Sequence, residues 1–573
     1  MTSEQKPANS NFLVGNSIPG ETAPDGQSSE SSDPNITQKP AKTHYPPSFW
    51  LAFLGLCCTG LVSALDGSIV STALPTIVAD LHGGDDYVWV VNVYFLTSAA
   101  LQPLSGQLSD LWGRRYVMIG STAIFLLGSG LCGGSTSMNM LIWSRAVQGI
   151  GAGGINMLID MIICDLVPMR ERGGFIGLLF LFVSLGATIG PFIGGILTDR
   201  VGWRWVFYIN LPFGGVAFIL LILFLQVKWK KELSTWERLK RLDVVGNAIL
   251  IGSTFAILWA LTYGGTRYTW NQGNVLAPLI IGLSGLIIAF FWEMSPWCKY
   301  PVMPPLHFKN RTSAAAFFLS FMTLLLAFWF NFFYPIYFQA VLQNSPTIAG
   351  VNTLPRAIFF PLFAAIGGWV VTKTGRYKPI HLVSSALVPL AMGLSAILDQ
   401  NSSKAEWIFF QIFAGIGGGA MISTTLQAVQ AALPESEVAT STGTWSFIRS
   451  LGTIWGVSVP SAIFNNRFDQ LSQQFEPDLR SMFTRGKAYE HATADFIRSF
   501  DPATRQIVIR SYVEALKRVW QIGVVFAGVT FLAVFFEKEI HLRTELTTEF
   551  GLDEKRPDMQ RRNTDTTVVE DSN

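Results

Sequence analysis

The stretch GQLSDLWGRR, residues 106–115, lies between two long apolar segments, VWVVNVYFLTSAALQPLS at 88–105 and YVMIGSTAIFLLGSGLCGG at 116–134. It gathers one carboxylate, two arginines and two glycines within ten residues. A charged turn between two such segments predicts a tight loop that joins two membrane-spanning helices. In this loop Gly106 permits close contact between helices, and Gly113 permits a turn conformation.

The charges of this loop predict a conformational latch. Asp110 can pair with Arg114 or cap the following backbone, and Arg114 can also reach Asp165 at the end of a later apolar segment. Such a cluster, with Arg115 included, is stable in one packing of the molecule and broken in another. The alternative is a topology signal, because Lys and Arg concentrate in cytoplasmic loops. That alternative explains Arg114 and Arg115, but it does not explain Asp110 or the glycines.

The composition indicates a membrane protein. Half of the 573 residues are hydrophobic and 14% are Asp, Glu, Lys or Arg, whereas a soluble domain carries about 25%. The five cysteines show neither zinc-site spacing nor a paired secretory pattern, and no phosphate-binding loop or nucleophile motif occurs. We therefore expect no metal, no cofactor, no nucleic-acid partner and no enzyme activity, and a source of energy other than ATP.

Fourteen apolar segments are long enough to cross a membrane, since a spanning helix needs about 20 residues. Lys and Arg number sixteen in the short loops on one side and four on the other, which places both termini in the cytoplasm. The predicted fold is an all-α integral membrane protein. Its spans lie near 48–73, 86–108, 116–135, 138–165, 173–198, 203–227, 243–263, 275–293, 313–340, 347–372, 379–398, 407–432, 442–464 and 518–536.

The chain also repeats itself. GIGAG at 149–153 matches GIGGG at 415–419 at an offset of 266 residues, which places the fourth span over the twelfth. This offset is explained by two parallel six-helix halves with two extra helices between them. Further matched pairs are Glu171 with Glu437 and, in the loop motif, Gly106 with Gly368, Gly113 with Gly375 and Arg114 with Arg376.

This repeat divides the chain into five parts. A disordered cytoplasmic tail at 1–47 has no apolar segment and no signal peptide. The other parts are a first half at 48–227, two extra helices with their loops at 228–312, a second half at 313–536 that includes a long external loop at 465–517, and a cytoplasmic tail at 537–573.

Charged residues inside the spans need a reason, because a charge at the bilayer centre costs about 2.5–3.5 kcal/mol by insertion scales. The second half has no charge at the positions that match Arg145 and Asp160, so packing alone does not require them. Arg145 lies roughly 10 Å inside the outer end of its helix, and Asp66 lies at a similar depth in the first helix. An acid that alternates between ionised and neutral forms can couple motion to protons. Asp66 is the first candidate and Asp160 the second; the alternative for Arg145 is snorkelling to the outer interface.

The fifth span contains GATIGPFIGG, in which glycines four residues apart permit another helix to approach closely. The proline removes a backbone donor and favours a bend. Ordinary packing of small residues is the alternative, but a proline between two Gly-xxx-Gly steps makes the pattern more specific. The residues are Gly186, Gly190, Pro191, Gly194 and Gly195.

The ninth span, FWFNFFYPIYFQAV at 328–341, is aromatic with a few polar groups. We expect Asn331, Tyr334 and Tyr337, with Gln427 of the twelfth span, to line a cavity for small amphipathic organic molecules. Lipid-facing aromatics are the alternative at each position.

Together these segments resemble the major facilitator superfamily. GQLSDLWGRR, RAVQGIGAGG and GATIGPFIGGIL match its loop, fourth-helix and fifth-helix antiporter motifs. With LDGSIVSTALPTI, DLVPMRERG and fourteen spans, the region 48–540 looks like the fungal drug:H+ antiporters. The motifs are degenerate in the second half, where Thr372 replaces the loop aspartate. The resemblance implies proton-driven export of drugs, antifungals, secondary metabolites or toxins, with Arg145 in proton coupling and the fifth-helix motif setting the direction of exchange.

Two other functions remain open at this point. A siderophore importer or a vacuolar amino-acid carrier shares the architecture, although an importer does not need the antiporter motif. A membrane sensor without transport usually has a large cytoplasmic tail, whereas 537–573 is short. We expect a monomer in the plasma membrane, with the vacuolar membrane as the alternative location.

Overall fold

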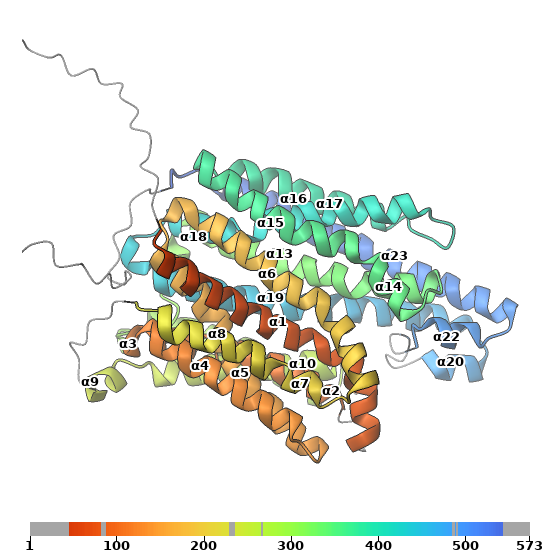
Figure 1. Ribbon diagram of the computed structural model, residues 1–573. Coiled ribbons are helices and arrows are strands. Elements are labelled where there is room, and N and C mark those ends of the chain that lie inside the picture. Colours follow the sequence, from red (N-terminus) through yellow and green to blue (C-terminus); the bar gives the residue numbers. More distant parts are fainter. Residues whose placement is uncertain are drawn as a thin grey trace, which may run out of the picture. The chain divides into compact units, whose positions relative to one another are not determined.

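The computed structural model describes residues 45–542 apart from 82–86, 228–234, 265–267, 484–487 and 489–490. The predicted disorder at 1–47 and the predicted tail at 537–573 therefore fall almost entirely outside the described residues. Within the described ranges the regular structure is helical, as predicted, and the long helices run along roughly one direction (Figure 1).

The first half consists of α1 to α8, and two extra helices, α10 and α11, follow it. The bounds are α1 Pro47–Leu81, α2 Tyr87–Ala100, α3 Gln102–Trp112, α4 Arg114–Gly133, α5 Met138–Leu166, α6 Met169–Arg200, α7 Trp205–Tyr208, α8 Asn210–Phe224, α9 Thr235–Lys240, α10 Val244–Tyr263 and α11 Gly273–Met294.

The second half consists of α13 to α23, preceded by a short helix, α12. The bounds are α12 Leu306–Lys309, α13 Arg311–Ile336 with the π-helical turn η2 Tyr337–Val341, α14 Pro346–Asn352, α15 Leu354–Thr374, α16 Lys378–Ser395, α17 Lys404–Ile422, α18 Thr425–Ala431, η3 Glu435–Glu437, α19 Val438–Leu471, α20 Pro477–Phe483, α22 Ala494–Arg498 and α23 Pro502–Ala533.

All fourteen predicted spans are helical in the described residues, and twelve of the helical segments are long and apolar enough to cross a membrane. The other two predicted spans correspond to α2, which ends at Ala100 before Pro103, and to α16, which begins at Lys378 and contains His381 and two adjacent serines. The count of fourteen spans therefore stays a prediction.

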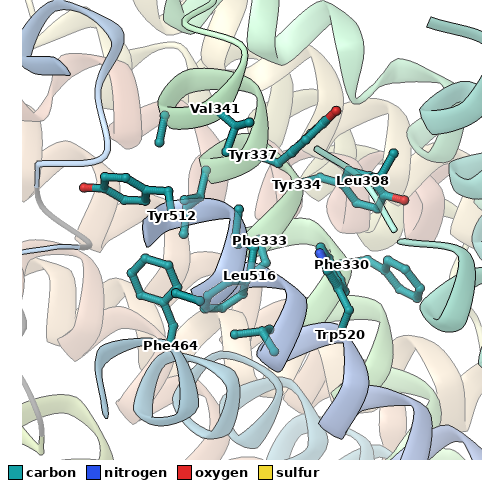
Figure 2. Close-up of a cluster of buried hydrophobic side chains, with 14 of the residues drawn as sticks. Phe330, Phe333, Tyr334, Tyr337, Val341, Leu398, Phe464, Tyr512, Leu516 and Trp520 are labelled. Carbon is teal, nitrogen blue, oxygen red and sulfur yellow. The ribbon is translucent and has the colours of Figure 1, made fainter. Parts of the chain in front are cut away.

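The predicted external loop at 465–517 is shorter than expected, because the flanking helices extend into it. The helix α19 continues to Leu471 and α23 already begins at Pro502. Aromatic packing explains the extension: Phe464 and Phe468 of α19 lie 6.0 and 4.7 Å, ring centroid to centroid, from Tyr512 of α23. Figure 2 shows this cluster of side chains from α13, α19 and α23.

Glycines confirm the internal repeat. Gly113 and its counterpart Gly375 both have positive φ, at 91° and 70°, so each loop turns where only glycine fits easily. A Cβ at Gly153 of α5 would overlap Ser98 O of α2, and a Cβ at Gly419 of α17 would overlap Phe360 O of α15. The two halves therefore use the same close helix contacts at matching positions.

The matched glutamates, Glu171 and Glu437, each hold the segment that precedes the first helix of their half. Tyr45 donates to Glu171 over 2.6 Å just before α1, and His307 contacts Glu437 over 3.1 Å just before α13. Burial lowers the pKa of His307 below its usual value, and the Glu437 carboxylate opposes this effect. The chain therefore enters both halves at the same end of the molecule.

The linker between α11 and α13 lies at that end too, beside the loop motif. Gln107 of α3 donates to Tyr300 O over 3.1 Å and accepts from Asn247 of α10 over 2.6 Å. The helices α3, α9 and α18 lie at this end in Figure 1, whereas α20 and α22 lie at the other end.

We expect an accessibility reporter inserted at Lys299, in this linker, to be cytoplasmic, like a reporter at the N-terminus. An impermeant thiol reagent should reach neither tag in intact cells, and it should reach both after permeabilisation. A reporter in the turn at 399–403 is the control for the opposite side. A linker tag labelled from outside while the N-terminal tag stays protected would refute the span count, and labelling of both tags from outside would refute the predicted orientation.

Candidate functional site

The predicted contact between Asp66 and Arg145 is confirmed. The Arg145 Nη1 atom of α5 lies 2.5 Å from Asp66 Oδ2 of α1, and both side chains are 0% exposed. The helices α1 and α5 bring the pair together from positions 79 residues apart. A fully buried ion pair inside a membrane protein points to function, since burying two charges is costly unless their geometry is good.

Two amides complete the shell around Asp66. Asp66 Oδ1 accepts from Gln148 Nε2 over 2.8 Å and from Asn210 Nδ2 over 2.6 Å. Both amides also donate to Ser129 Oγ, and all three residues are buried. None of these three residues was predicted from the sequence, although Gln148 lies in RAVQGIGAGG and Asn210, the first residue of α8, lies in the segment FYINLP. Each of the three is a polar side chain within an apolar segment, and this feature of the sequence could have identified them as candidates.

Arg145 is held from several sides. Its Nε donates to Val90 O of α2 over 3.0 Å, its Nη1 also donates to Gln148 Oε1 over 2.8 Å, and its guanidinium lies 4.2 Å from the Tyr94 ring centroid. A planar fork of donors suits these simultaneous contacts. The snorkelling alternative is wrong in this structure, because the guanidinium is buried among α1, α2 and α5.

Asp66 is thus a carboxylate whose charge state affects several helices at once. While it is ionised, it binds α5 through Arg145 and α8 through Asn210. Protonation removes the charge that Arg145 contacts and turns one acceptor oxygen into a donor. Within the described residues no group of His, Cys, Asp and Glu side chains forms a metal site.

The contacts predicted for the latch form around Arg114, whereas its action as a latch stays a prediction. Its Nε donates to Asp165 Oδ2 over 2.8 Å, and its Nη1 contacts both Asp110 Oδ1 and Ser109 Oγ. The Arg114 side chain is 0% exposed, and those of Asp165 and Asp110 are 5% and 34% exposed. Arg114 therefore pairs with Asp110 and also reaches Asp165, and it joins α3, α4 and α5.

Arg115 requires a correction, because it does not join this cluster. Its Nη2 donates to Ile222 O of α8 over 2.7 Å. On a helix adjacent residues point in different directions, so Arg115 faces α8 while Arg114 faces α3 and α5. Gly106 does permit the close helix contact that was predicted for it, since a Cβ there would meet the Met157 side chain of α5.

The fifth-helix glycines have unequal roles in the structure. A Cβ at Gly186 would overlap Leu61 O of α1, and a Cβ at Gly190 would overlap the Ser68 side chain of α1. These two glycines therefore permit the close approach of α1 and α6, as predicted. A Cβ at Gly195 would meet nothing within 4 Å, so close packing does not explain that glycine.

The other two residues of this motif are Gly194 and Pro191. Gly194 is buried, and its carbonyl accepts from Thr198 Oγ1 over 2.7 Å. The side chain of Pro191 lies outside what the structure describes. The role of the motif in exchange direction stays a prediction.

The two halves meet along a seam at the end that carries the loop motif. Arg170 of α6 donates to Thr372 O and Lys373 O of α15, both over 2.8 Å, and Arg172 donates to Gln430 Oε1 over 2.6 Å. Further along α6, toward the other end, Leu185 and Phe192 are exposed. The described conformation is therefore closed at the loop-motif end.

The four predicted cavity residues are not brought together. Gln427 donates to Met169 O and so belongs to the seam. Tyr334 and Tyr337 are buried in the cluster of Figure 2, where their hydroxyls contact Ser395 Oγ over 2.7 Å and Asp399 O over 2.9 Å. Asn331 is exposed, and it accepts from Arg356 over 3.4 Å. Their part in substrate binding stays a prediction.

Asp160 lies apart from Asp66. It contacts Arg449 of α19 over 2.9 Å, so it belongs to the seam between the halves. Arg449 and Arg356 are further, partly buried cations that were not predicted from the sequence. Both are arginines within apolar helices, which was the signal that identified Arg145.

Comparison with known proteins gives consistent results. A family model described as the Major Facilitator Superfamily matches residues 56–457. The MFS-type efflux transporter phmH of Phaeosphaeria nodorum is 76% identical over 536 residues, which cover 92% of each chain. The MFS-type efflux transporter ffsH of Aspergillus flavipes is 64% identical over 92% of this chain and 91% of its own.

Among solved structures, the human organic anion transporter MFSD10 has a TM-score of 0.55 and 13% identity, covering 86% of this chain and 100% of its own. A double Trp mutant of XylE has a TM-score of 0.55 and 15% identity, covering 86% and 96%. At such low identity these two structures support the fold alone.

Proposed function

Because this chain belongs to the major facilitator superfamily, we propose that it is an efflux transporter that exchanges protons for small amphipathic organic compounds. The relatives at 76% and 64% identity are named efflux transporters, which supports the direction of transport. In this proposal the proton gradient supplies the energy, and the protein acts as a monomer with no cofactor and no enzyme activity.

The buried Asp66–Arg145 pair is the observation that carries the proposal of proton coupling. Asp66 is 0% exposed, and it has one cation and two amide donors around it. The ion pair with Arg145 depends on the charge of the carboxylate, so protonation makes that contact less favourable. A site whose contacts between helices depend on one proton can shift the balance between two conformations.

The proposed cycle follows from the closed seam. With the loop-motif end closed, protons from the other side reach Asp66 and weaken its contacts with α5 and α8. The halves then rearrange, the loop-motif end opens to the cytoplasm, and the proton leaves as substrate binds. The latch around Arg114 biases the equilibrium between these two packings, because its contacts hold α3, α4 and α5 in one arrangement.

The proposed substrates are drugs, antifungals, secondary metabolites or toxins, and the proposed location is the plasma membrane with both termini in the cytoplasm. The close contact of α1 with α6 at Gly186 and Gly190 supports an exporter, since these residues form the antiporter motif that an importer does not need.

Transport assays in inside-out vesicles test the proposal. We expect vesicles with the protein to accumulate a panel of amphipathic compounds when their interior is acidic, and we expect an uncoupler to abolish the uptake. Vesicles without the protein are the control. Uptake that follows ATP and ignores the uncoupler would refute proton exchange, and transport of iron chelates or amino acids toward the cytoplasm would refute export.

A further inference from the structure

Three arginines lie more than one turn inside the predicted spans, namely Arg145, Arg356 and Arg449. Arg145 pairs with Asp66 over 2.5 Å, and Arg449 pairs with Asp160 over 2.9 Å. Among the described residues, no carboxylate oxygen lies within 4.0 Å of Arg356. A charge within a membrane span is costly without a partner, so Arg356 lacks the compensation that the other two arginines have.

The protein offers Arg356 of α15 two neutral acceptors, both from α13. Its Nη2 donates to Ala327 O over 2.6 Å, and its Nη1 donates to Asn331 Oδ1 over 3.4 Å. Its Nε has no hydrogen-bond partner among the described residues. The guanidinium carbon lies 6.0 Å from the Phe330 ring centroid and 5.5 Å from the Phe360 ring centroid, so the surroundings are largely apolar. A guanidinium carries five N–H donors, and these neutral contacts leave its charge uncompensated.

Asn331 places a second donor beside this cation. Because arginine only donates hydrogen bonds, the contact with Arg356 directs the Asn331 carbonyl oxygen toward the guanidinium and its Nδ2 group away from it. This Nδ2 group forms no hydrogen bond with the described residues. In α13, which is described throughout, only Asn331 and the first residue of the helix are exposed. The two side chains therefore present N–H donors and one positive charge to the same space.

The side of α13 that carries Asn331 faces the first half of the protein. The helix α19 packs on α13 where a Cβ at Gly456 would overlap Leu325 O. The helix α15 packs on α13 where Arg356 donates to Ala327 O. With 3.6 residues per turn, Asn331 lies on the side of α13 between these two contacts. Both neighbouring helices also contact the first half, α15 at α6 and α19 at α5.

The helices α6 and α15 have separated at the level of Arg356. They run in opposite directions, since the first turn of α6 contacts the last turn of α15. They touch where a Cβ at Gly177 of α6 would overlap Ala364 O of α15. Arg356 lies eight residues, about 12 Å, from Ala364, and Leu185 lies eight residues from Gly177 on the facing helix and is 47% exposed. A molecule that enters from the end opposite the loop motif therefore meets Arg356 and Asn331 before it reaches the closed seam.

We propose that Arg356 and Asn331 form an anion-binding subsite, and that the exported compounds are amphipathic organic anions. The ionised oxygen of the compound accepts hydrogen bonds from the guanidinium and from the amide, and its charge compensates the cation. The apolar body of the compound packs on Phe328 and Phe332, which flank Asn331 on α13. These two rings are partly exposed, and their centroids lie 6.2 Å apart.

This inference rests on the proposed function, because it names the substrate class of the same transport pathway. It narrows the amphipathic compounds proposed above to those that carry an ionised acidic group at neutral pH. The alternative role of Arg356 is structural, since its bond to Ala327 O holds α15 against α13. Only the anion-binding role makes the affinity of the protein depend on the charge of the ligand.

The test compares two probes that differ in charge. 1-Naphthylacetate is anionic at neutral pH, whereas 1-naphthylacetamide is neutral and nearly the same size. Dissociation constants are measured by equilibrium dialysis with the full-length protein in nanodiscs of uncharged lipid, and empty nanodiscs correct for binding to the lipid. We expect the protein to bind the anion about tenfold more tightly than the amide, because hydrogen bonds between charged groups are stronger than those between neutral groups.

Substitutions of Arg356 separate its charge from its packing. Arg356→Gln should bind both probes equally, and Arg356→Lys should keep part of the preference for the anion, since it retains the charge without the planar fork of donors. Arg376→Gln is the matched control. It removes an arginine that follows α15 in the same half and is 60% exposed, and it should keep the full preference.

Asn331→Asp tests the subsite while it keeps the arginine. The introduced carboxylate should pair with Arg356 and compensate its charge, so the preference for the anion should be lost although the contact between α13 and α15 is retained. A purely structural role for Arg356 predicts no change in this variant. Thermal unfolding of each variant in the same nanodiscs verifies that the protein is folded, and Asn331→Asp decides the outcome if Arg356→Gln does not fold.

Equal binding of the two probes by the wild-type protein, or a preference for the anion that survives in either Arg356→Gln or Asn331→Asp, would overturn the inference. If export is sensitive to the uncoupler while the two probes bind equally, this inference alone fails. If the preference depends on Arg356 and Asn331 while export ignores the uncoupler, proton exchange fails and the anion-binding subsite stands.

Discussion

Arg145→Ala should reduce proton-driven export by about a hundredfold or more. The substitution leaves Asp66, which is fully buried, with two amide donors and no cation. Breaking a buried ion pair by removing one partner costs about 3–5 kcal/mol, and Asp66 escapes this cost by remaining protonated. A carboxyl group that never releases its proton cannot couple a gradient to a conformational change. The measurement is uncoupler-sensitive uptake into inside-out vesicles, normalised to the amount of inserted protein.

Three further variants separate this effect from misfolding. Asp66→Asn/Arg145→Ala removes both charges, so it should insert normally and still lack proton-driven transport. Arg145→Lys keeps the charge but cannot reproduce the contacts with Val90 O, Asp66 and Gln148, so a partial loss is expected. Arg204→Ala removes an exposed arginine of the same half and should transport normally. Normal turnover in the double variant would place proton coupling elsewhere.

Asp110→Asn should lower export about tenfold while the amount of protein in the membrane stays normal. Arg114 keeps Asp165 and Ser109 as partners in this variant, so no buried charge loses its compensation. The change removes only the charge on the partly exposed side of the latch, and this shifts the balance between the two packings of the helices. Transport rate and membrane abundance are measured on the same vesicles.

Substitutions of the two neighbouring arginines serve as comparisons for Asp110→Asn. Arg114→Ala should lower the abundance of folded protein, because it leaves the buried Asp165 carboxylate without its cation. Arg115→Gln should leave turnover close to normal, since Arg115 contacts a backbone carbonyl of α8 and neither carboxylate. If Asp110→Asn transports normally and Arg115→Gln does not, GQLSDLWGRR acts as a topology signal and the latch proposal is wrong.

The sequence alone determined the helical membrane class, the repeat and the identity of the main ion pair. Length and apolarity are local properties, so each spanning helix is visible without its neighbours. The depths of Asp66 and Arg145 follow from counting residues along their helices, and a charge in a bilayer needs a partner. Glycines such as Gly113 and Gly186 were also readable, because a turn or a close helix contact restricts the residue type at one position.

Only the tertiary structure decided which polar groups share a site. Gln148, Asn210 and Ser129 come from different segments, and their convergence on Asp66 depends on how α4, α5 and α8 pack. The same packing separates Tyr334 and Gln427, which the sequence grouped in one cavity, and it turns Arg115 away from its neighbour. The contact of Asp160 with Arg449 spans 289 residues and both halves. The pattern along one helix gives the depth of a side chain, but the rotation of the helix and its neighbours are set by the packing of the whole bundle.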